Sequence, residues 1–428
     1  MSHILALPVW GMVFWGVITF SILVFLHEGG HFLAARLFGV NVHEFMLGLP
    51  GPALRVHTKS GTAFGVTAIP LGGYVRIAGM EPGGEDPLLA AALKVSAEAD
   101  RIDARALAQA LDVPVEKASA LLVTLADYMA LDPADDDDVS YVSRVTAGSD
   151  ESADALLARV RRHTYRGLRT WQRMLVLAAG VAVNIVAAIL TFIVVLSIWG
   201  NPTPSLTLQT VLPKTAAQAV GLKPGDTVVA VDGARLKGWD QLLARLRKAR
   251  PGDQVTITYV RGGQARTANA VLGKQDGRAF LGVGPQIEYH GLPLLTAVTD
   301  SFKLTGAVFA ALGQFLGGII HPRQFVASLK DARSVVGIAE LAAQQAQAGP
   351  LDYSWFIAFL SLSLGAMNIL PIPPLDGGKV LVEGIERAAG HPLKREVSLA
   401  ISATGTLLLF SLIGYLMYAD IARIATGH

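Results

Sequence analysis

The chain has 428 residues, of which 52% are hydrophobic and only 16% are charged. Because soluble domains usually contain about 25% charged residues, this composition indicates a membrane protein. The formal net charge of +2 gives no reason to expect nucleic acid as a partner. The chain has no cysteine, which excludes disulfides, thiolate metal sites and cysteine nucleophiles.

Four stretches lack charged residues over the roughly 20 residues that a helix needs to cross about 30 Å of hydrocarbon. They are Val9–Leu26, Met174–Trp199, Tyr353–Leu375 and Val397–Ala419. A fifth apolar stretch, Thr305–Ile320, is shorter, and we expect it to form an interfacial or re-entrant helix. The first stretch lacks a basic start and leads directly into His27, so we expect it to remain attached rather than to be removed as a signal peptide.

Basic residues predict the orientation of these spans. They gather at the entry to the second span and in the loop between the third and fourth: Arg159, Arg161, Arg162, Arg166, Arg169 and Arg173, then Lys379, Arg387, Lys394 and Arg395. Cytoplasmic loops carry the excess of Lys and Arg, so both segments are expected in the cytoplasm and both chain ends outside it. Residues 201–352 are then expected to be extracytoplasmic.

A β-hairpin is predicted after the first span. Ala53–Thr58 and Thr62–Ile69 are rich in valine, threonine and isoleucine, and Lys59, Ser60 and Gly61 supply turn chemistry between them. An extended peptide could add to the free edge of such a hairpin as a further strand. The alternative is a plain connector.

Residues 85–165 are helical and acidic in character. Apolar residues at helical spacing are broken at Asp112-Val113-Pro114, which resembles a helix-turn-helix pair. Glu98–Arg159 contains 14 acidic and 5 basic residues, and the resulting net charge of −9 would repel phosphate. We therefore expect a small cytoplasmic helical insert rather than a DNA-binding domain. Asp135–Asp138 lacks the glycine and glutamate of a calcium loop and is expected to be a solvated loop.

A soluble domain is predicted over residues 201–290. Its expected strands are Leu206–Val211, Thr227–Val231, Gln254–Val260 and Ala268–Leu272, with a helix at Trp239–Lys248. The stretch TAAQAVGLKPGDTVVAVDG resembles a PDZ domain of the type found with bacterial proteases. The resemblance implies a groove for a peptide end or an extended segment, and the alternative is a structural spacer.

The sequence FLHEGGHF, residues 25–32, contains the chemistry of a metal site. In a helix, His27 and His31 lie four residues apart on one face, so two imidazoles can reach one ion. Glu28 projects to the side and can contact a water on that ion, which is the HExxH arrangement of zinc peptidases. The alternative, a polar cluster that only packs the bundle, conflicts with the cost of ionisable groups in an apolar helix.

A third ligand is expected where the third span ends in NILPIPPLDGG. Asp376 is the only ionisable residue from Tyr353 through Gly378, and it follows an apolar stretch about as long as the one before His27. Both therefore reach the cytoplasmic side of the membrane. The prolines of this motif forbid regular helix there, and non-helical backbone at that depth is tolerated only inside protein or along a wet cavity.

Together, HEGGH, IPLGGYVRI after a hairpin, a PDZ domain and NILPIPPLDGG resemble the site-2 protease family of intramembrane zinc metalloproteases, in particular the bacterial regulator-of-sigma-E proteases. The resemblance implies that His27, His31 and Asp376 bind Zn²⁺ and that Glu28 is the catalytic base. It also implies that Asn368 holds the substrate or stabilises the oxyanion, and that the hairpin receives the unwound substrate as a strand.

The chain departs from the family pattern at three places. Gly29 stands where members commonly have a larger residue, AGVAVN replaces an AGPxxN-like motif around Asn184, and a Gly-Pro-Ile element is replaced at residues 335–338. Gly29 and Gly30 are expected to let another backbone approach the metal closely. His43 and His57 are expected on the hairpin surface, because three ligands are already assigned.

The predicted fold is a polytopic α-helical membrane protein with four transmembrane helices, a membrane-associated β-hairpin, an extracytoplasmic α/β PDZ domain and the cytoplasmic insert. The expected divisions are residues 1–84 (first span and hairpin), 85–165 (insert), 166–200 (second span), 201–290 (PDZ domain), 291–352 (amphipathic or interfacial helices) and 353–428 (third and fourth spans).

The predicted function is an intramembrane zinc endopeptidase in the bacterial cytoplasmic membrane. Its expected partners are the lipid bilayer, a peptide or substrate end at the PDZ domain, and single-span membrane substrates such as trimmed anti-sigma factors or signal-peptide remnants. The alternative is a non-catalytic membrane adaptor that binds peptides through its PDZ domain. A metal transporter would need ligands on both sides of the membrane, and the sequence places them at one depth.

Overall fold

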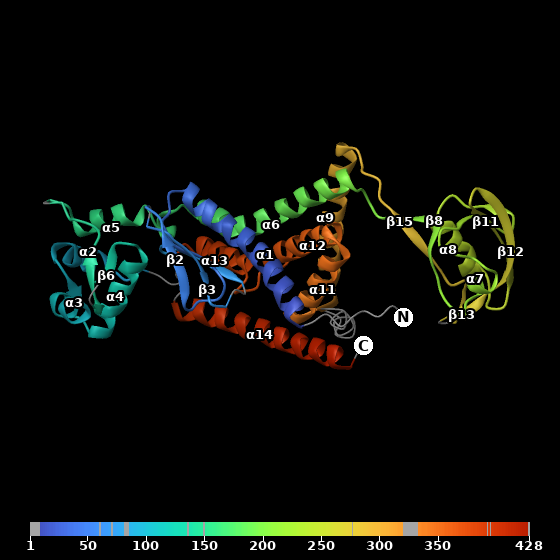
Figure 1. Ribbon diagram of the computed structural model, residues 1–428. Coiled ribbons are helices and arrows are strands. Elements are labelled where there is room, and N and C mark those ends of the chain that lie inside the picture. The colour runs from blue at the N-terminus through green and yellow to red at the C-terminus, as the bar shows by residue number, and fades with distance from the viewer. Residues whose placement is uncertain are drawn as a thin grey trace. The chain divides into compact units, whose positions relative to one another are not determined.

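A computed structural model of the chain describes residues 9–59, 61–69, 72–80, 85–134, 137–148, 150–275, 277–319, 333–391, 393 and 395–426. The chain divides into two compact units (Figure 1). Unit 1 comprises residues 1–192 and 302–428, and unit 2 comprises residues 193–301.

Long helices dominate unit 1. They are α1 (Val9–Leu37), α6 (Thr170–Ile198), α9 (Leu294–Ile319), α11 (Val335–Ala348), α12 (Pro350–Asn368), α13 (Asp376–Ala389) and α14 (Arg395–Thr426), with α6 and α9 continuing into unit 2. Four helices in the described residues are long and apolar enough to cross a membrane: Val9–Leu37, Thr170–Ile198, Leu294–Gln314 and Glu396–Ala422.

This set differs from the expected spans in one member. The stretch Tyr353–Leu375 is not one helix, because α12 ends at Asn368 before a segment whose prolines cannot donate helical hydrogen bonds. Thr305–Ile320 was expected to be a short interfacial or re-entrant helix, but residues 305–319 belong to α9, which starts at Leu294 and is longer than predicted. Ile320 lies outside the described residues. Asp300 and Lys303 interrupt the charge-free run without interrupting the helix.

A four-stranded sheet follows α1. Its strands are β1 (Val42–Leu47), β2 (Ala53–His57), β3 (Ala63–Thr67) and β4 (Gly73–Ile77), in the order β2-β3-β1-β4. The predicted hairpin is present as the antiparallel pair β2–β3, whereas β1 and β4 were not predicted. β1 is parallel to β3 and antiparallel to β4. Phe32 of α1 packs edge-on against Phe45 and Phe64, which fixes the sheet to the helix.

The insert was predicted to be helical, and it contains three short strands, which were not predicted, as well as helices. Its elements are α2 (Leu89–Glu98), β5 (Ile102–Asp103), α3 (Ala104–Leu111), α4 (Val115–Asp127), β6 (Leu131–Ala134), β7 (Asp137–Ser143) and α5 (Ala153–Arg161), and a short 3-10 helix, η1 (Tyr165–Gly167), leads to α6. The predicted break between two helices is confirmed: Asp112 is left-handed, with φ of 51°, and Pro114 precedes α4.

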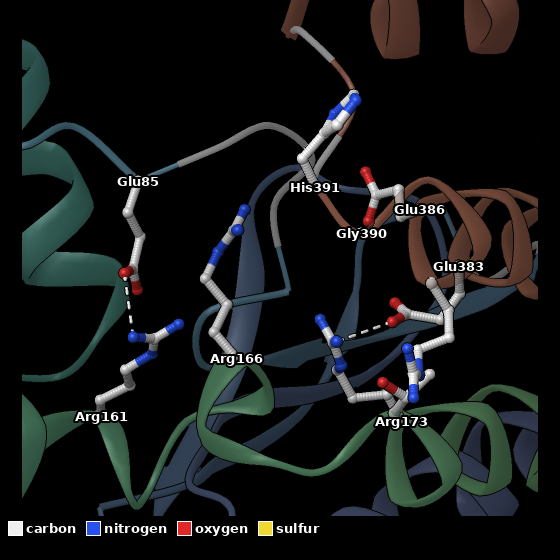
Figure 2. A pocket seen from close by; sticks show the side chains of 10 residues that line it. Glu85, Arg161, Arg166, Arg173, Glu383, Glu386, Gly390 and His391 are labelled. Carbon is white, nitrogen blue, oxygen red and sulfur yellow. Dashed lines mark ion pairs between the residues drawn. The ribbon is translucent and has the colours of Figure 1, made fainter.

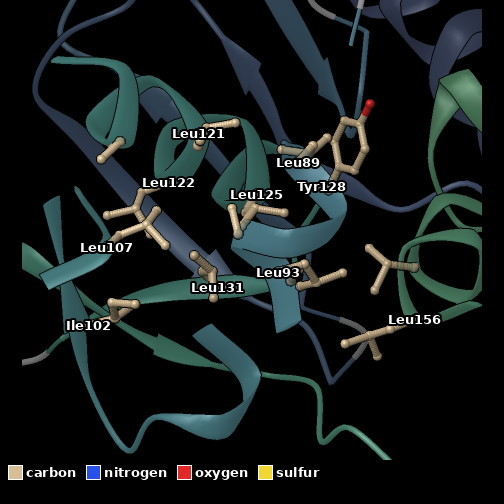
Figure 3. Close-up of a cluster of buried hydrophobic side chains, with 14 of the residues drawn as sticks. Leu89, Leu93, Ile102, Leu107, Leu121, Leu122, Leu125, Tyr128, Leu131 and Leu156 are labelled. Atoms are coloured by element: carbon tan, nitrogen blue, oxygen red, sulfur yellow. The ribbon is translucent and has the colours of Figure 1, made fainter. Parts of the chain in front are cut away.

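The order of these elements defines the module. A helix and a strand precede the helix-turn-helix of α3 and α4, a β-hairpin follows it, and the sheet order is β5-β7-β6. This is the topology of a winged helix. Leucines from all four helices fill its core, including Leu93, Leu107, Leu122 and Leu156 (Figure 3). The module therefore has a hydrophobic core of its own.

Unit 2 is a β-rich unit with a six-stranded sheet. Its elements are β8 (Thr203–Val211), α7 (Ala216–Ala219), β9 (Thr227–Val231), β10 (Ala234–Arg235), α8 (Trp239–Lys248), β11 (Gln254–Arg261), β12 (Gln264–Val271), β13 (Gly273–Gln275), β14 (Arg278–Phe280) and β15 (Val283–Glu288). The main strand order is β12-β11-β9-β8-β15. All four predicted strands and the helix are present. Trp239 and Leu242 of α8 are buried in its core.

Candidate active site

Two histidines and an aspartate converge inside unit 1. His27 and His31 face the same side of α1, and both are at least nine-tenths buried. Their Nε2 atoms lie 3.0 and 3.1 Å from Oδ2 of Asp376. One potential ligand atom from each residue lies within 4.8 Å of the others. This cluster can hold a metal ion, and it is the group that the sequence predicted.

The NILPIPPLDGG motif places Asp376 by folding tightly on itself. Asp376 is the first residue of α13 and is 5% exposed. A Cβ added to Gly377 would lie 2.2 Å from the oxygen of Ile369, and one added to Gly378 would lie 2.3 Å from the nitrogen of Pro373. Both distances are too short for any side chain. The two glycines therefore let the start of α13 contact the proline-containing segment that precedes it.

Helix α6 supplies a second layer around the histidines. Nδ1 of His31 lies 2.8 Å from the carbonyl oxygen of Val176 and donates a hydrogen bond to it. Nε2 of His31 is then unprotonated, so its lone pair is available to a metal. Nδ2 of Asn184 lies 3.4 Å from Nδ1 of His27, while its buried Oδ1 has no partner among the described residues. Turning this amide over would make Oδ1 the acceptor for His27 Nδ1–H. Both histidines would then present Nε2 to the same ion, so the residues fit a metal.

Close approach of α6 to α1 depends on glycine. A Cβ on Gly30 would lie 2.4 Å from the carbonyl oxygen of Ala179, and a Cβ on Gly180 would lie 2.4 Å from Nε2 of His31. The expectation that Gly30 admits another backbone is confirmed, because that backbone is α6. A Cβ on Gly29 would meet nothing within 4 Å in the described part of the chain, so open space lies beside it.

Glu28 lies against the sheet. Its Oε2 accepts a hydrogen bond from the backbone nitrogen of Val75 at 3.0 Å. Val75 lies on β4, which forms one end of the described four-stranded sheet. The strand edge at the carboxylate is therefore that of β4, not that of the predicted β2–β3 hairpin.

The remaining predicted residues have other contacts. The side-chain nitrogen of Asn368 donates to the carbonyl oxygen of Leu364, one turn earlier in α12. His43 lies on β1 with its Nε2 2.8 Å from the carbonyl oxygen of Asp127, so the surface role expected for it is wrong. His57 is exposed on β2, as expected. Sequence reasoning missed the contact of Lys379, whose Nζ lies 3.3 Å from Oδ1 of Asp376. The three-residue spacing of Asp376 and Lys379 on a helix was the signal that could have predicted it.

Two cavities lie near the start of α6 and the C-terminal part of α13, and the smaller one reaches the proline-containing segment. The larger, of about 520 Å³, is lined by Glu85, Arg161, Arg166, Thr170, Arg173, Glu383, Glu386, Arg387, Gly390 and His391 (Figure 2). Ion pairs join Arg161 to Glu85 at 3.4 Å and Arg173 to Glu383 at 2.8 Å. The smaller cavity, of about 270 Å³, shares four of these residues and extends to Pro373, Pro374 and Lys379. The larger cavity is thus lined mainly by charged side chains, whereas the smaller one, next to the segment that holds Asp376, has a mixed polar and apolar lining.

The fold and the site define a helical membrane protein with a buried cluster of two histidines and an aspartate that can hold a metal ion, and with a neighbouring carboxylate. Peptidase family M50 matches residues 15–412. The chain belongs to this family, which confirms the resemblance to site-2 proteases, and the protein is a zinc metalloprotease.

The similar proteins include curated relatives from bacteria. The chain is 29% identical to "Zinc metalloprotease RasP" of Shouchella clausii, over 95% of this chain and 98% of the relative. It is 27% identical to "Regulator of sigma-W protease RasP" of Bacillus subtilis, over 95% of this chain and 97% of the relative. Among solved structures, one match is the PDZ domain of the SdrC-like protein of Listeria monocytogenes. The matched region covers 19% of this chain and 87% of the solved PDZ domain, with 23% identity and a TM-score of 0.18.

Proposed function

We propose that this protein is an intramembrane endopeptidase that cleaves single-span membrane proteins, with zinc held by His27, His31 and Asp376 and with Glu28 as the base. The observation that carries the proposal is the convergence of these groups within unit 1, beside a β-strand edge. Three protein ligands leave a coordination position for water, as catalytic zinc sites require.

Zinc at this site would polarise the scissile carbonyl and lower the pKa of a bound water toward about 7. Glu28 would take the proton from that water and pass it to the leaving nitrogen. The hydrogen bond from Val75 holds the Glu28 carboxylate at the edge of β4. His31 and His27 are oriented by the carbonyl of Val176 and by Asn184.

The substrate would bind as an added strand on β4. A helical substrate hides its carbonyls in internal hydrogen bonds, so cleavage requires that it unwinds locally. The free edge of β4 offers backbone donors and acceptors to such an unwound segment. Because the same edge contacts Glu28, a segment bound there would lie next to the base. Asn368 would contact the substrate or the oxyanion after releasing Leu364.

The protein would act in the bacterial cytoplasmic membrane, with its PDZ domain and both ends extracytoplasmic. Arginines and lysines near the entry to α6 and around α13 support this orientation. The substrates would be trimmed anti-sigma factors or signal-peptide remnants, and the name of the Bacillus relative supports a role in sigma-factor regulation. The PDZ domain would bind a new peptide end or restrict substrate size.

The decisive comparison is between wild type and Glu28→Gln, each purified with its zinc content measured. We expect both to bind one zinc and only wild type to cleave a single-span test substrate, because Gln cannot accept the proton. Equal cleavage by the two proteins would contradict Glu28 as the base. A zinc-loaded wild type that binds peptides but cleaves no membrane substrate would favour the adaptor.

A further inference from the structure

One buried carboxylate of the winged-helix module contacts the four-stranded sheet that follows α1. Asp127 is the last residue of α4, and its side chain is 4% exposed. Its Oδ2 accepts a hydrogen bond from the backbone nitrogen of Gly79 at 3.0 Å. Its Oδ1 lies 3.7 Å from Nε2 of His43 and 3.8 Å from the guanidinium of Arg76. We call Asp127, His43, Arg76 and Gly79 the Asp127 clasp.

The clasp joins the module to the end strand β4 and to its sheet neighbour β1. His43 is on β1, Arg76 is on β4, and Gly79 is in the turn that follows β4. His43 also donates from Nε2 to the carbonyl oxygen of Asp127 at 2.8 Å. Burying a carboxylate costs free energy unless it is hydrogen-bonded or paired with a charge. The contacts of Asp127 with Gly79 and Arg76 offset this cost. The module and the strand pair therefore have one defined relative position.

Packing around Gly79 supports the same conclusion. Gly79 has φ of +73°, and a Cβ added to it would lie 2.8 Å from Thr164 and 3.4 Å from the ring of Tyr128. Tyr128 directly follows α4, and its hydroxyl is hydrogen-bonded to Glu85. The turn after β4 thus lies against Tyr128, which follows α4, and against Thr164, which follows α5, as well as against Asp127.

The surface of α4 does not suit the usual task of a winged helix. The second helix of a helix-turn-helix reads DNA with polar and basic side chains, and phosphate contacts require Lys or Arg. The exposed residues of α4 are Val115, Glu116, Lys117, Ser119, Ala120 and Val123. Lys117 is the only cation of this helix, and it lies 3.5 Å from Asp86. The structure shows instead that the C-terminal end of α4 contacts the four-stranded sheet and the turn that follows β4.

The clasp is close to the candidate catalytic base along a short strand. Val75, whose nitrogen donates to Glu28, precedes Gly79 by four residues, which is about 13 Å of extended chain. An end strand has a sheet neighbour on one side only, so its position depends on contacts at its ends and on its outer face. The clasp supplies such a contact at the C-terminal end of β4.

We infer that Asp127 is a positioning residue for proteolysis: through the clasp, the winged-helix module holds β4 where it can receive the unwound substrate. This inference depends on the proposed function, because β4 matters to catalysis only if a substrate binds along it. Loss of the clasp would allow β4 to move, so the substrate would bind more weakly while zinc and its ligands stay in place.

The test uses the full-length, zinc-loaded protein and compares Asp127→Ala, Asp127→Asn and Asp132→Ala. Asn keeps an acceptor for Gly79 N–H, and Asp132 is a half-exposed acid of β6 in the same module that pairs with Arg144 and is not part of the clasp. For a single-span substrate, we expect Asp127→Ala to raise KM about tenfold, the effect of one charge-assisted hydrogen bond, with kcat and zinc content close to wild type. Asp127→Asn should raise KM less, and Asp132→Ala should leave KM unchanged.

Hydrogen exchange of the same proteins separates positioning from unfolding. In Asp127→Ala, we expect faster exchange in residues 73–79 and unchanged exchange in α2 and α3. A wild-type KM in Asp127→Ala, or a raised KM with faster exchange throughout the module, would overturn the inference. A zinc-loaded wild type that cleaves nothing would instead contradict the proposed function, while the exchange of residues 73–79 would still report whether the clasp holds β4.

Discussion

The metal site and the Asp127 clasp are both buried polar clusters of unit 1, and they are built in different ways. In the metal site, two of three candidate ligands come from one turn of one helix, and the third comes from a motif with its own fixed shape. In the clasp, the participants come from β1, β4, a turn and α4. The comparison teaches that spacing along one helix can be read from a sequence, whereas a contact between separately folded elements cannot.

The largest effect is expected at the metal site. Asp376→Ala removes the only carboxylate of the candidate ligand set and leaves two imidazoles. We expect this variant to lose most of its zinc and to show no measurable cleavage, because three protein ligands are the usual minimum of a catalytic zinc site. Zinc content by elemental analysis and cleavage of a single-span substrate measure this. Full zinc retention with wild-type cleavage would remove Asp376 from the site.

Two adjacent glycines provide the next test. In Gly30→Ala, the new Cβ would lie 2.4 Å from the oxygen of Ala179, so α6 must move away from the histidines. We expect a loss of about 1–3 kcal/mol of stability and a large loss of cleavage. Gly29→Ala is the matched control: it meets nothing within 4 Å among the described residues and should stabilise the helix by about 1 kcal/mol. Thermal unfolding in detergent compares the two, and equal destabilisation would contradict the close α1–α6 contact.

A smaller effect is expected at Asn184. Partners that orient metal-bound histidines typically contribute about 10–100-fold to metal affinity. Asn184→Ala removes the group next to Nδ1 of His27, so we expect zinc affinity to fall within that range while the fold is kept. Competition with a chelator measures this affinity. Ser361, whose hydroxyl donates to the backbone oxygen of Asn184, offers a control as Ser361→Ala, which should change zinc affinity less.

The smallest effect is expected at His43 of the Asp127 clasp, as a change in how stability depends on pH. Burial lowers the pKa of His43 from its usual value of 6.5, and the neighbouring Arg76 and Arg144 act in the same direction. As pH falls through about 6.5, the unfolded chain takes up a proton at His43 before the folded chain does, so stability is lost toward acid pH and retained above 6.5. His43→Gln should reduce this loss. Thermal unfolding between about pH 5 and 7.5 measures it, and identical pH profiles would contradict a buried neutral His43.

The sequence predicted the elements whose signals are local. HEGGH lies on one helix, so four-residue spacing placed His27 and His31 together, and turn residues marked the β2–β3 hairpin. α9 was misjudged because two charges, Asp300 and Lys303, interrupt its apolar run. The prolines after Asn368 were recognised as helix-breaking, yet the whole stretch was still counted as one span.

Other features had no local signal. β1 pairs with β3 and with β4, which both come later in the chain, and β5 has only two residues, so their pairing partners define these strands. No role was assigned to Asn184 because AGVAVN departs from the family pattern, but its place on α6 brings it to His27. Asp127 looked like one acid among many. Its burial against Gly79 depends on how the module docks, which no spacing within the chain encodes.

X-ray absorption at the zinc edge of the purified wild-type protein tests the central claim most directly. The account predicts a first shell of nitrogen and oxygen at about 2.0–2.2 Å with two imidazoles, and loss of one imidazole in His31→Ala. A zinc environment without imidazole, or one that His31→Ala leaves unchanged, would contradict the assignment of this site.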